Sequence, residues 1–183
     1  MVMMVEPIFK AVSALRKSKN TPPRPSLSKR GVRGEFRSRV VLFSAKGKKF
    51  TQATARKWSK LDQLIFICGR YEGVDERVAQ YIADEEISIG DYVLFGGEVP
   101  AMVVTEAVTR LLPGAVGKEE SIQNESFVAG VLEHPHYTRP ERIKIDGVMR
   151  RVPKVLLSGN HKKISDWRKA NSKSMTRENA DRI

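Results

Sequence analysis

The stretch Leu64–Pro100 reads LIFICGRYEGVDERVAQYIADEEISIGDYVLFGGEVP and contains three glycine-marked turns. These turns are residues 69–73 (GRYEG), 89–92 (IGDY) and 95–100 (FGGEVP). The first turn follows a short apolar run, Leu64–Cys68, which is typical of a buried strand in a parallel sheet. The other two turns flank a second apolar run, Asp91–Leu94.

Glycine-rich turns at the ends of strands predict a pocket whose walls are largely main chain. Glycine lets the backbone approach a ligand closely. In open α/β sheets, ligands bind at the carboxyl ends of the strands. Any one of the three turns is, by itself, an ordinary tight loop. Three of them in one stretch favour a ligand site.

Length and composition limit the class of protein. A chain of 183 residues forms one domain, with room for part of a second. Its 40% hydrophobic content is enough for a core, and no apolar run approaches the roughly 20 residues of a membrane helix. Glu6 and Pro7 interrupt the N-terminal segment, which therefore does not resemble a signal peptide. The single cysteine, Cys68, excludes an internal disulfide and fits a reducing cytoplasm, so we expect a cytoplasmic protein.

The net charge of +12 is distributed unevenly along the chain. Residues 1–60 carry a net charge of +14, residues 61–117 carry −7, and residues 118–183 carry +5. A basic periphery around an acidic centre indicates a polyanionic partner and a neutral or cationic ligand. Nucleic acid is the expected polyanion, and solubility alone is the weaker explanation.

Hydrophobic periodicity and turn residues predict an α/β fold with a parallel sheet. In the helix that follows Pro100, the predicted apolar face is Met102, Val103, Ala107 and Leu111. A glycine turn at residues 44–47 is expected to end the first strand. The predicted strands are Val40–Phe43, Leu64–Cys68 and Lys154–Leu157. The predicted helices are Val2–Lys17, Gln52–Lys60, Asp75–Ile82, Ala101–Leu112 and one that begins with His161–Lys169.

Two long segments are predicted to be irregular. Residues 18–39 are rich in Pro, Ser, Gly and Arg and read as a mobile basic loop. Contact with phosphate and simple solvation are equally compatible with this loop. Residues 114–153 contain Gly, Pro and short polar runs, which is typical of a lid, a functional loop or a linker. The tail from Ser172 is polar and is expected to be an unfinished part of a domain.

Five motifs occur in the same order as in a known family. The segments GRYEG, DEEISIGDYVLFGGEVPAM, ESF, HPHYTRP and VLLSGNHKKISDWR resemble the bacterial tRNA (guanine-N1)-methyltransferases, TrmD, of the SPOUT superfamily of α/β-knot methyltransferases. The resemblance runs from Val2 into the final helix. It implies a homodimer with a deep trefoil knot at the carboxyl end of a parallel sheet. It also implies S-adenosyl-L-methionine as cofactor, tRNA as substrate, and methylation of N1 of the guanine just 3′ of the anticodon.

The same resemblance implies a domain organisation. A methyltransferase domain is expected over residues 1–158, followed at residues 159–183 by the beginning of a small helical, tRNA-binding domain. Family members begin with a strand, a helix and a glycine-rich loop before the MMVEP segment, so we expect this sequence to lack them and most of the C-terminal domain. An inactive cofactor- or RNA-binding remnant is therefore the alternative function. A knot enzyme acting on ribosomal RNA is a weaker one.

The resemblance also implies which residues contact the cofactor. Main-chain amides and carbonyls can recognise the edge of an adenine, and the acidic middle third favours the positive sulfonium. The sequence has neither a P-loop nor a dinucleotide fingerprint, which argues against nucleoside triphosphates and NAD. The implied cofactor residues are Leu42, Phe43, Ser44 and Ala45; Gly69, Tyr71 and Glu72; and Ser88, Ile89, Gly90, Tyr92, Leu94, Gly96, Gly97 and Pro100.

Methylation of N1 requires two further groups. Neutral guanine carries a proton on N1, so a carboxylate should accept it, and a cation should stabilise the charge that develops on O6. The resemblance assigns the base to Glu125 and the cation to Arg110. It places Ser126, Glu133 and His136 in the segment that orders around the target base. The family usually has Asp at positions 125 and 133, and the extra methylene of Glu would move each carboxylate.

Structural roles are the alternatives for several of these residues. Without the motifs, Arg110 would read as half of a surface ion pair, and Glu125 is one acid among 21. The three histidines have no metal-ligand spacing and no partner cysteines, so no metal site is expected. Trp58 and Trp167 are expected to be packing anchors.

Overall fold

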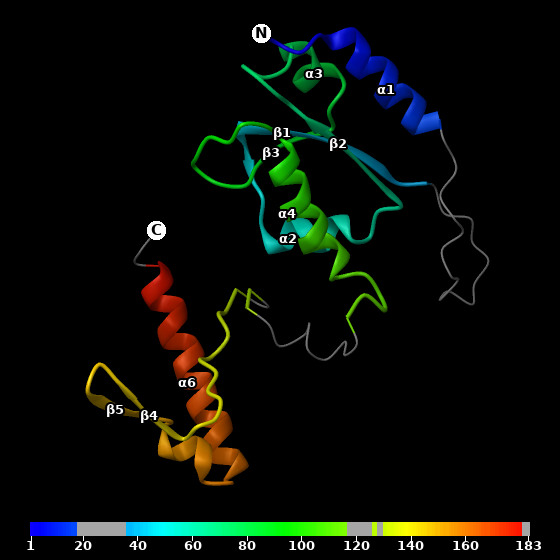
Figure 1. Ribbon diagram of the computed structural model, residues 1–183. Helices are drawn as coiled ribbons and strands as arrows, with labels where there is room; N and C mark the ends of the chain where they lie inside the picture. Colours follow the sequence, from blue (N-terminus) through cyan, green and yellow to red (C-terminus); the bar gives the residue numbers. More distant parts are fainter. Residues whose placement is uncertain (18–35, 117–125, 128–129, 181–183) are drawn as a thin grey trace, which may run out of the picture. The chain divides into compact units, whose positions relative to one another are not determined.

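The computed structural model describes residues 1–17, 36–116, 126–127 and 130–180 (Figure 1). The chain separates into two compact units, Met1–Gly117 and Lys118–Ile183. The domain boundary expected after residue 158 falls inside the second unit. The predicted basic loop at residues 18–39 lies almost entirely outside the described residues.

The first unit is built on a three-stranded parallel sheet, which confirms the predicted sheet type. Strand β1 (Ser38–Lys49) lies between β2 (Gln63–Cys68) and β3 (Glu85–Ser88) (Figure 1). Val41 of β1 pairs with Phe66 on one side and with Glu85 on the other. The carboxyl ends of all three strands therefore meet at one edge of the sheet.

Strand β1 is longer than its sequence predicts. The glycine turn expected after Phe43 is wrong, because the strand continues to Lys49. Ile87 of β3 pairs with both Phe43 and Lys48, so the pairing is interrupted by a bulge and then resumes. Gly47 allows this, because a Cβ at this position would lie 2.5 Å from the main-chain nitrogen of Ile87. The glycine marks a close approach of two strands.

Strand β3 was absent from the predicted elements. It begins with two acidic residues, and only Ile87 and Ser88 are buried. Glu85 obscures the strand pattern, yet it is half-buried and lies 3.7 Å from both Arg39 and Lys57. The apolar run Asp91–Leu94 forms no strand and is exposed.

Helices cover both faces of the sheet (Figure 1). Helices α1 (Val5–Lys17) and α3 (Glu76–Tyr81) lie on one face, and α2 (Gln52–Trp58) and α4 (Glu98–Thr109) lie on the other. Alternate residues of β1 point to opposite faces. Val40 and Leu42 join the first apolar cluster, whereas Val41 and Phe43 join the second.

The four helices predicted within the first unit are all present, but their ends are shifted. Helix α1 begins at Val5 rather than Val2, because Met3 pairs as an isolated parallel bridge with Val74. Helix α3 is capped by Asp75, which accepts a hydrogen bond from the main-chain N–H of Arg77. In α2, Trp58 is almost completely buried, as expected of a packing anchor.

The predicted apolar face of α4 is correct only in part, because Ala107 and Leu111 pack against the second apolar cluster but Met102 and Val103 do not. Met102 and Val103 are 71% and 44% exposed, whereas Val104 and Val108 are buried against the sheet. The helix carries apolar side chains around most of its circumference, so periodicity alone did not identify the buried face. Exposed apolar side chains on α4 therefore remain to be explained.

The second unit contains an antiparallel hairpin, a short 3₁₀ helix and a long helix. The elements are β4 (Arg142–Ile145), β5 (Val148–Arg151), η1 (Lys154–Leu157) and α6 (His161–Ala180). The strand predicted at Lys154–Leu157 is wrong, because so short an apolar run fits a strand or a helical turn equally well. The last helix extends through the polar tail to Ala180.

The hairpin corrects the expectation that residues 114–153 are irregular throughout. Its turn residues, Asp146 and Gly147, both have positive φ, +49° and +78°. This is the geometry for which Asp-Gly is favoured, so the dipeptide was a usable signal. None of the helices in the described ranges is both long and apolar enough to cross a membrane.

Candidate functional site

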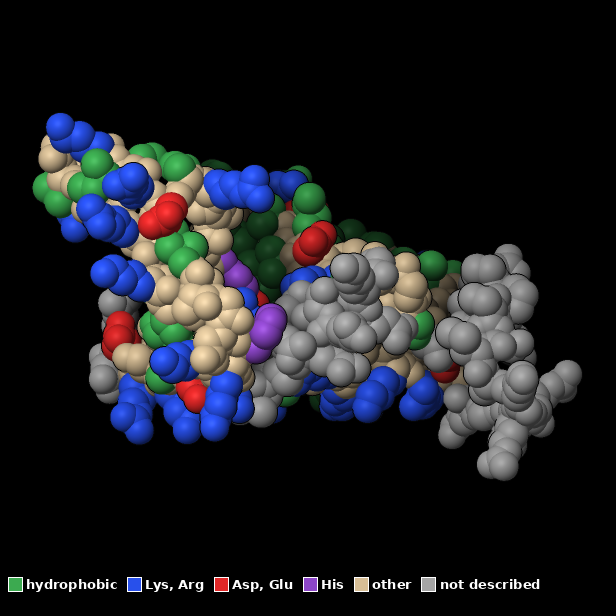
Figure 2. Space-filling view, turned by 90° about the horizontal axis from the view of Figure 1, so that it is seen from below, with side chains coloured by type: hydrophobic (Ala, Val, Ile, Leu, Met, Phe, Trp, Pro, Cys, Tyr) green, Lys and Arg blue, Asp and Glu red, His purple; other side chains and the backbone are tan. Residues whose placement is uncertain are grey.

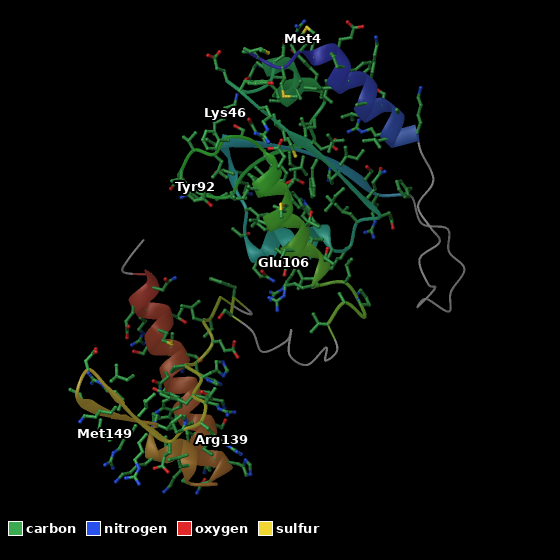
Figure 3. The ribbon with its side chains drawn as sticks, in the orientation of Figure 1. Met4, Lys46, Tyr92, Glu106, Arg139 and Met149 are labelled. Atoms are coloured by element: carbon green, nitrogen blue, oxygen red, sulfur yellow. The ribbon has the colours of Figure 1, made fainter. Side chains whose placement is uncertain are left out.

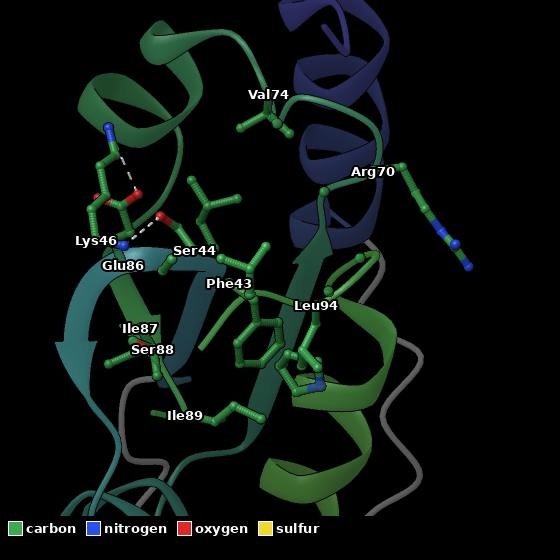
Figure 4. Close-up of a pocket in the computed structure, with 18 of the residues that line it drawn as sticks. Phe43, Ser44, Lys46, Arg70, Val74, Glu86, Ile87, Ser88, Ile89 and Leu94 are labelled. Carbon is green, nitrogen blue, oxygen red and sulfur yellow. Dashed lines mark hydrogen bonds and ion pairs between the residues drawn. The ribbon is translucent and has the colours of Figure 1, made fainter. Parts of the chain in front are cut away.

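A pocket of about 480 Å³ lies at the carboxyl ends of the three parallel strands (Figure 4). Every one of the fifteen residues predicted to contact the cofactor lines it. They come from the end of β1, from the turn after β2, and from the segment between β3 and α4. The residues are Leu42, Phe43, Ser44, Ala45, Gly69, Tyr71, Glu72, Ser88, Ile89, Gly90, Tyr92, Leu94, Gly96, Gly97 and Pro100.

Two of the glycine turns are joined directly. The main-chain N–H of Gly97 donates a 2.9 Å hydrogen bond to the carbonyl oxygen of Gly69. Beside it, Arg70 pairs with Gly96 as an antiparallel bridge. The Arg70 guanidinium extends away from Lys46 (Figure 4) and donates a 2.7 Å hydrogen bond to Glu98.

These contacts have electrostatic consequences. The hydrogen bond from Arg70 holds the pKa of the Glu98 carboxyl below its usual value. The neighbouring Cys68 is half-buried, and burial raises the pKa of its thiol, with a smaller contribution from Glu98. The Arg70–Glu98 ion pair therefore links the first glycine turn to the start of α4. The Cys68 thiol beside it stays protonated near neutral pH because its pKa is raised.

The third turn is held by its own side chains. Ser88 Oγ donates to the carbonyl oxygen of Gly90 at 2.9 Å and accepts from the Gly90 N–H at 3.2 Å. The Tyr92 hydroxyl donates to the carbonyl oxygen of Ile89 at 3.1 Å. Gly90 lies against the Tyr92 ring, so a Cβ at position 90 would collide with it. This turn is consequently a defined wall of the pocket.

A charged group in the pocket was missed by sequence reasoning. Lys46 Nζ donates a 2.6 Å hydrogen bond to Glu76 and lies 4.0 Å from Glu86 (Figure 4). The bond to Glu76 raises the pKa of Lys46. One carboxylate oxygen of Glu86 is buried without a hydrogen-bond partner among the described residues. The only sequence signal for this group was the position of Lys46 directly after Ala45.

Of the two proposed catalytic residues, only Arg110 is among the described residues, and it lies outside this pocket. Arg110 caps the C-terminus of α4, is exposed, and does not line the pocket. Its main-chain N–H donates to the carbonyl oxygen of Glu106. Glu125 lies outside the described residues.

The three residues expected around the target base do lie together, in the second unit. The main-chain N–H of Glu133 donates to Ser126 Oγ at 3.0 Å, and the Glu133 carboxylate lies 2.9 Å from His136 Nε2. The His136 ring lies 4.6 Å from that of His134. Basic side chains of α6 share the cavity beside them: Arg168, Lys169 and Lys173.

Comparison with known proteins identifies the family. The family model described as "tRNA (Guanine-1)-methyltransferase TrmD" matches residues 1–182. The chain belongs to this family. The TrmD relatives include a protein of Carboxydothermus hydrogenoformans, 51% identical over 94% of this chain and 59% of its own length. A relative from Heliobacterium modesticaldum is 50% identical over 98% of this chain and 61% of its own length. One from Bacillus subtilis is 45% identical over 94% of this chain and 63% of its own length.

Each of these three relatives is named tRNA (guanine-N(1)-)-methyltransferase. The chain spans about three fifths of their length. A TrmD-family methyltransferase requires a methyl donor, and the pocket volume falls within the roughly 300–1,000 Å³ of small-molecule sites. Among the described residues, no cluster of three or more His, Cys, Asp or Glu side chains could hold a metal ion.

Proposed function

We propose that this chain uses S-adenosyl-L-methionine to methylate N1 of the guanine just 3′ of the anticodon in tRNA. Family membership and the names of the relatives support this activity. The observation that carries the proposal is the pocket, where fifteen residues from three separate segments converge at the carboxyl ends of parallel strands. In open α/β sheets this is where ligands bind.

The residues of the pocket suit this cofactor. Apolar groups from Leu42 and Leu94 provide flat contact area, and the glycine turns expose main-chain donors and acceptors to an adenine. The pocket lining contains three carboxylates, of Glu72, Glu76 and Glu86, and two cationic side chains, of Lys46 and Arg70. Arg70 is paired with Glu98, so the carboxylates outnumber the cations. The resulting negative potential favours a sulfonium cation.

We assign the proton transfer to Glu125 and the charge stabilisation to Arg110. When bound, the cofactor supplies an electrophilic methyl group. Glu125 would accept the proton of guanine N1, and Arg110 would stabilise the negative charge on O6. Ser126, Glu133 and His136 would hold the target base, and their mutual hydrogen bonds are consistent with one preassembled segment.

A homodimer with a trefoil knot at the cofactor site completes the proposal. Apolar side chains beside the pocket are strongly exposed in the single chain: Phe95 is 96%, Val93 is 89% and Met102 is 71% exposed. Such a patch is typical of a protein interface. A second copy would cover it. Cytoplasmic tRNA is the proposed substrate.

Methyl transfer from labelled cofactor tests the activity. The acceptors are two tRNA transcripts that differ only in having guanine or adenine immediately 3′ of the anticodon. We expect transfer to the guanine transcript alone. If the protein binds the cofactor but methylates neither transcript, the activity is wrong and the binding-remnant alternative holds. Ribosomal RNA is included as a third acceptor, and transfer to it in place of tRNA would support the other alternative.

Two substitutions test the catalytic assignments. Glu125→Gln and Arg110→Ala should each reduce turnover by at least 100-fold, which is on the order of the contribution of a general base or charge stabiliser. Both variants should retain cofactor binding. Glu125→Asp is the matched control, since it keeps the carboxylate, and it should retain measurable turnover. Wild-type rates in Glu125→Gln would contradict the assignment of the base.

A further inference from the structure

The β4–β5 hairpin has a high density of positive charge. Its strands carry four cationic side chains, Arg142, Lys144, Arg150 and Arg151, and its turn carries one acid, Asp146. All eight strand residues are exposed. The proposed catalytic chemistry uses none of these residues.

The strand register sorts these side chains onto two faces. Arg142 is opposite Arg151, and Lys144 is opposite Met149, so these four share a face, named here the basic face. The other face holds the two remaining pairs and is named the apolar face. Its members are Ile143, Ile145, Val148 and Arg150. Three cations therefore lie on one side of the ribbon and one on the other.

Contacts at the base of the hairpin show which face turns away from its own unit. The main-chain N–H of Val152 donates to the carbonyl oxygen of Glu141, which extends the ladder by one pair. Both residues line a cavity together with Leu156 and Ile164 of the same unit. By alternation, Glu141 and Val152 continue the apolar face. The basic face consequently points away from this cavity.

The basic face has no ionic partner within the described residues. None of Arg142, Lys144 and Arg151 forms an ion pair there, although Glu141 and Asp146 are close in sequence. Figure 3 shows the hairpin with its side chains, including Met149, spread away from the ribbon. Lys and Arg side chains also recur over the part of Figure 2 that this unit occupies, at the left. An extended polyanion is the complementary partner.

We propose that the basic face of the β4–β5 hairpin binds the sugar–phosphate backbone of tRNA. The inference rests on the proposed function, which supplies the RNA. Arg142 and Lys144 are about 7 Å apart along their strand, and Arg151 lies about 5 Å across from Arg142. This spacing presents three charges to successive phosphates. Contacts to phosphates carry no sequence information directly, so we expect this contact to be independent of the tRNA sequence.

The salt dependence of tRNA binding tests this proposal. The test variant combines Arg142→Gln, Lys144→Gln and Arg151→Gln, and tRNA affinity is measured by fluorescence anisotropy between about 50 and 200 mM KCl. Loss of three phosphate contacts should weaken binding by at least tenfold at low salt. It should also reduce the slope of log K against log salt by roughly 2–3. KM for tRNA should rise, with kcat and cofactor affinity unchanged.

Arg150→Gln is the matched control, because it removes one arginine of the same hairpin from the apolar face. It should leave both affinity and salt slope within error of the wild type. A second variant, Arg142→Lys with Arg151→Lys, keeps the charges and should bind tRNA normally, which separates charge from folding.

Several outcomes would overturn the inference. One is an unchanged affinity and salt slope in the triple variant, and another is an equal loss in Arg150→Gln. A third outcome is that the wild type binds phosphatidylserine vesicles and the triple variant does not, while both bind tRNA equally well. This result would assign the basic face to a membrane. If the wild type binds tRNA and methylates none, the proposed activity fails, while the slope change still decides the hairpin contact.

Discussion

Gly97 is the residue on which the shape of the pocket most directly depends. A Cβ at this position would lie 2.6 Å from the Cα of Cys68 and 3.1 Å from the nitrogen of Gly69, both main-chain atoms. Main chain cannot move aside as a side chain can. Gly97→Ala must therefore separate the two turns and lengthen the hydrogen bond between Gly97 and Gly69.

We expect Gly97→Ala to destabilise the protein by about 1–3 kcal/mol, the usual cost of overpacking. It should also weaken cofactor binding at least tenfold. Thermal unfolding and calorimetric titration measure the two effects. Gly69→Ala is the control for stability, since its Cβ would meet only a side-chain atom of Val74 at 3.4 Å. Equal unfolding temperatures for both variants would contradict the argument.

Asp75 makes stability depend on pH at the first turn of α3. The hydrogen bond from the Arg77 side chain lowers the pKa of this carboxyl to about 2. In an unfolded chain it would be about 3.9. Because the folded pKa is lower, the stabilisation is complete above about pH 5 and is lost as pH falls through the folded pKa of about 2.

Asp75→Asn keeps a side chain that caps the helix but removes the charge. We expect the wild type to be more stable than this variant at pH 6, and the difference to shrink at pH 2.5. Urea unfolding at the two pH values measures it. Arg77→Gln should show the same pattern, since it removes the partner. A difference that is identical at both pH values would show that the ion pair is not its cause.

At the scale of the element, the sequence of α4 did not show which of its side chains are buried, so substitutions on its buried and exposed faces have to be compared. Val104 is fully buried in the cluster that joins α4 to α2 and the sheet. Val104→Ala should lower the free energy of unfolding by about 2 kcal/mol, through lost transfer energy and a small cavity. Thr109→Ala, at an exposed position of the same helix, should change it by less than about 0.5 kcal/mol. Chemical denaturation of both variants measures the two free energies of unfolding. Equal losses would contradict the assignment of Val104 to the buried face.

The elements that sequence predicted well are those with one dominant signal. The apolar run of β2 and the short helix α3 each have a local signal, and both elements were predicted within one residue of their ends. The end of β1 was misjudged because Gly47 reads as a turn, while its actual role depends on Ile87, distant in sequence. The 3₁₀ helix at Lys154–Leu157 was misassigned because four residues carry too little periodicity.

The candidate site was predicted through ordered motifs more than through local physics. The glycine turns around Gly69, Gly90 and Gly97 indicated a pocket, and the resemblance supplied its individual members. The charged group formed by Lys46 and Glu76 was missed, since the ion pair joins residues from two elements whose proximity only the fold creates. Sequence reasoning alone will miss any such pair whose two residues belong to different elements.

At the scale of the whole molecule, self-association is the central prediction. Met102 and Met4 are both 71% exposed in the single chain, but Met102 lies on α4, which begins shortly after the exposed Phe95 in the sequence, whereas Met4 precedes α1. We expect Met102→Glu to convert a dimer to a monomer in sedimentation experiments, because it would bury a charge in the proposed interface. Met4→Glu, with equal exposure, should leave the dimer intact. Dimers in both variants would place the interface elsewhere.

The position of β1 in the sheet has a consequence for synthesis. Both strands that pair with it follow it in the chain, so Val41 meets Phe66 only after 25 further residues and Glu85 after 44. While the chain emerges from the ribosome, the central strand has both hydrogen-bonding edges open until each neighbour arrives. Slow translation between Phe43 and Ser88 would prolong that exposure and favour association of nascent chains.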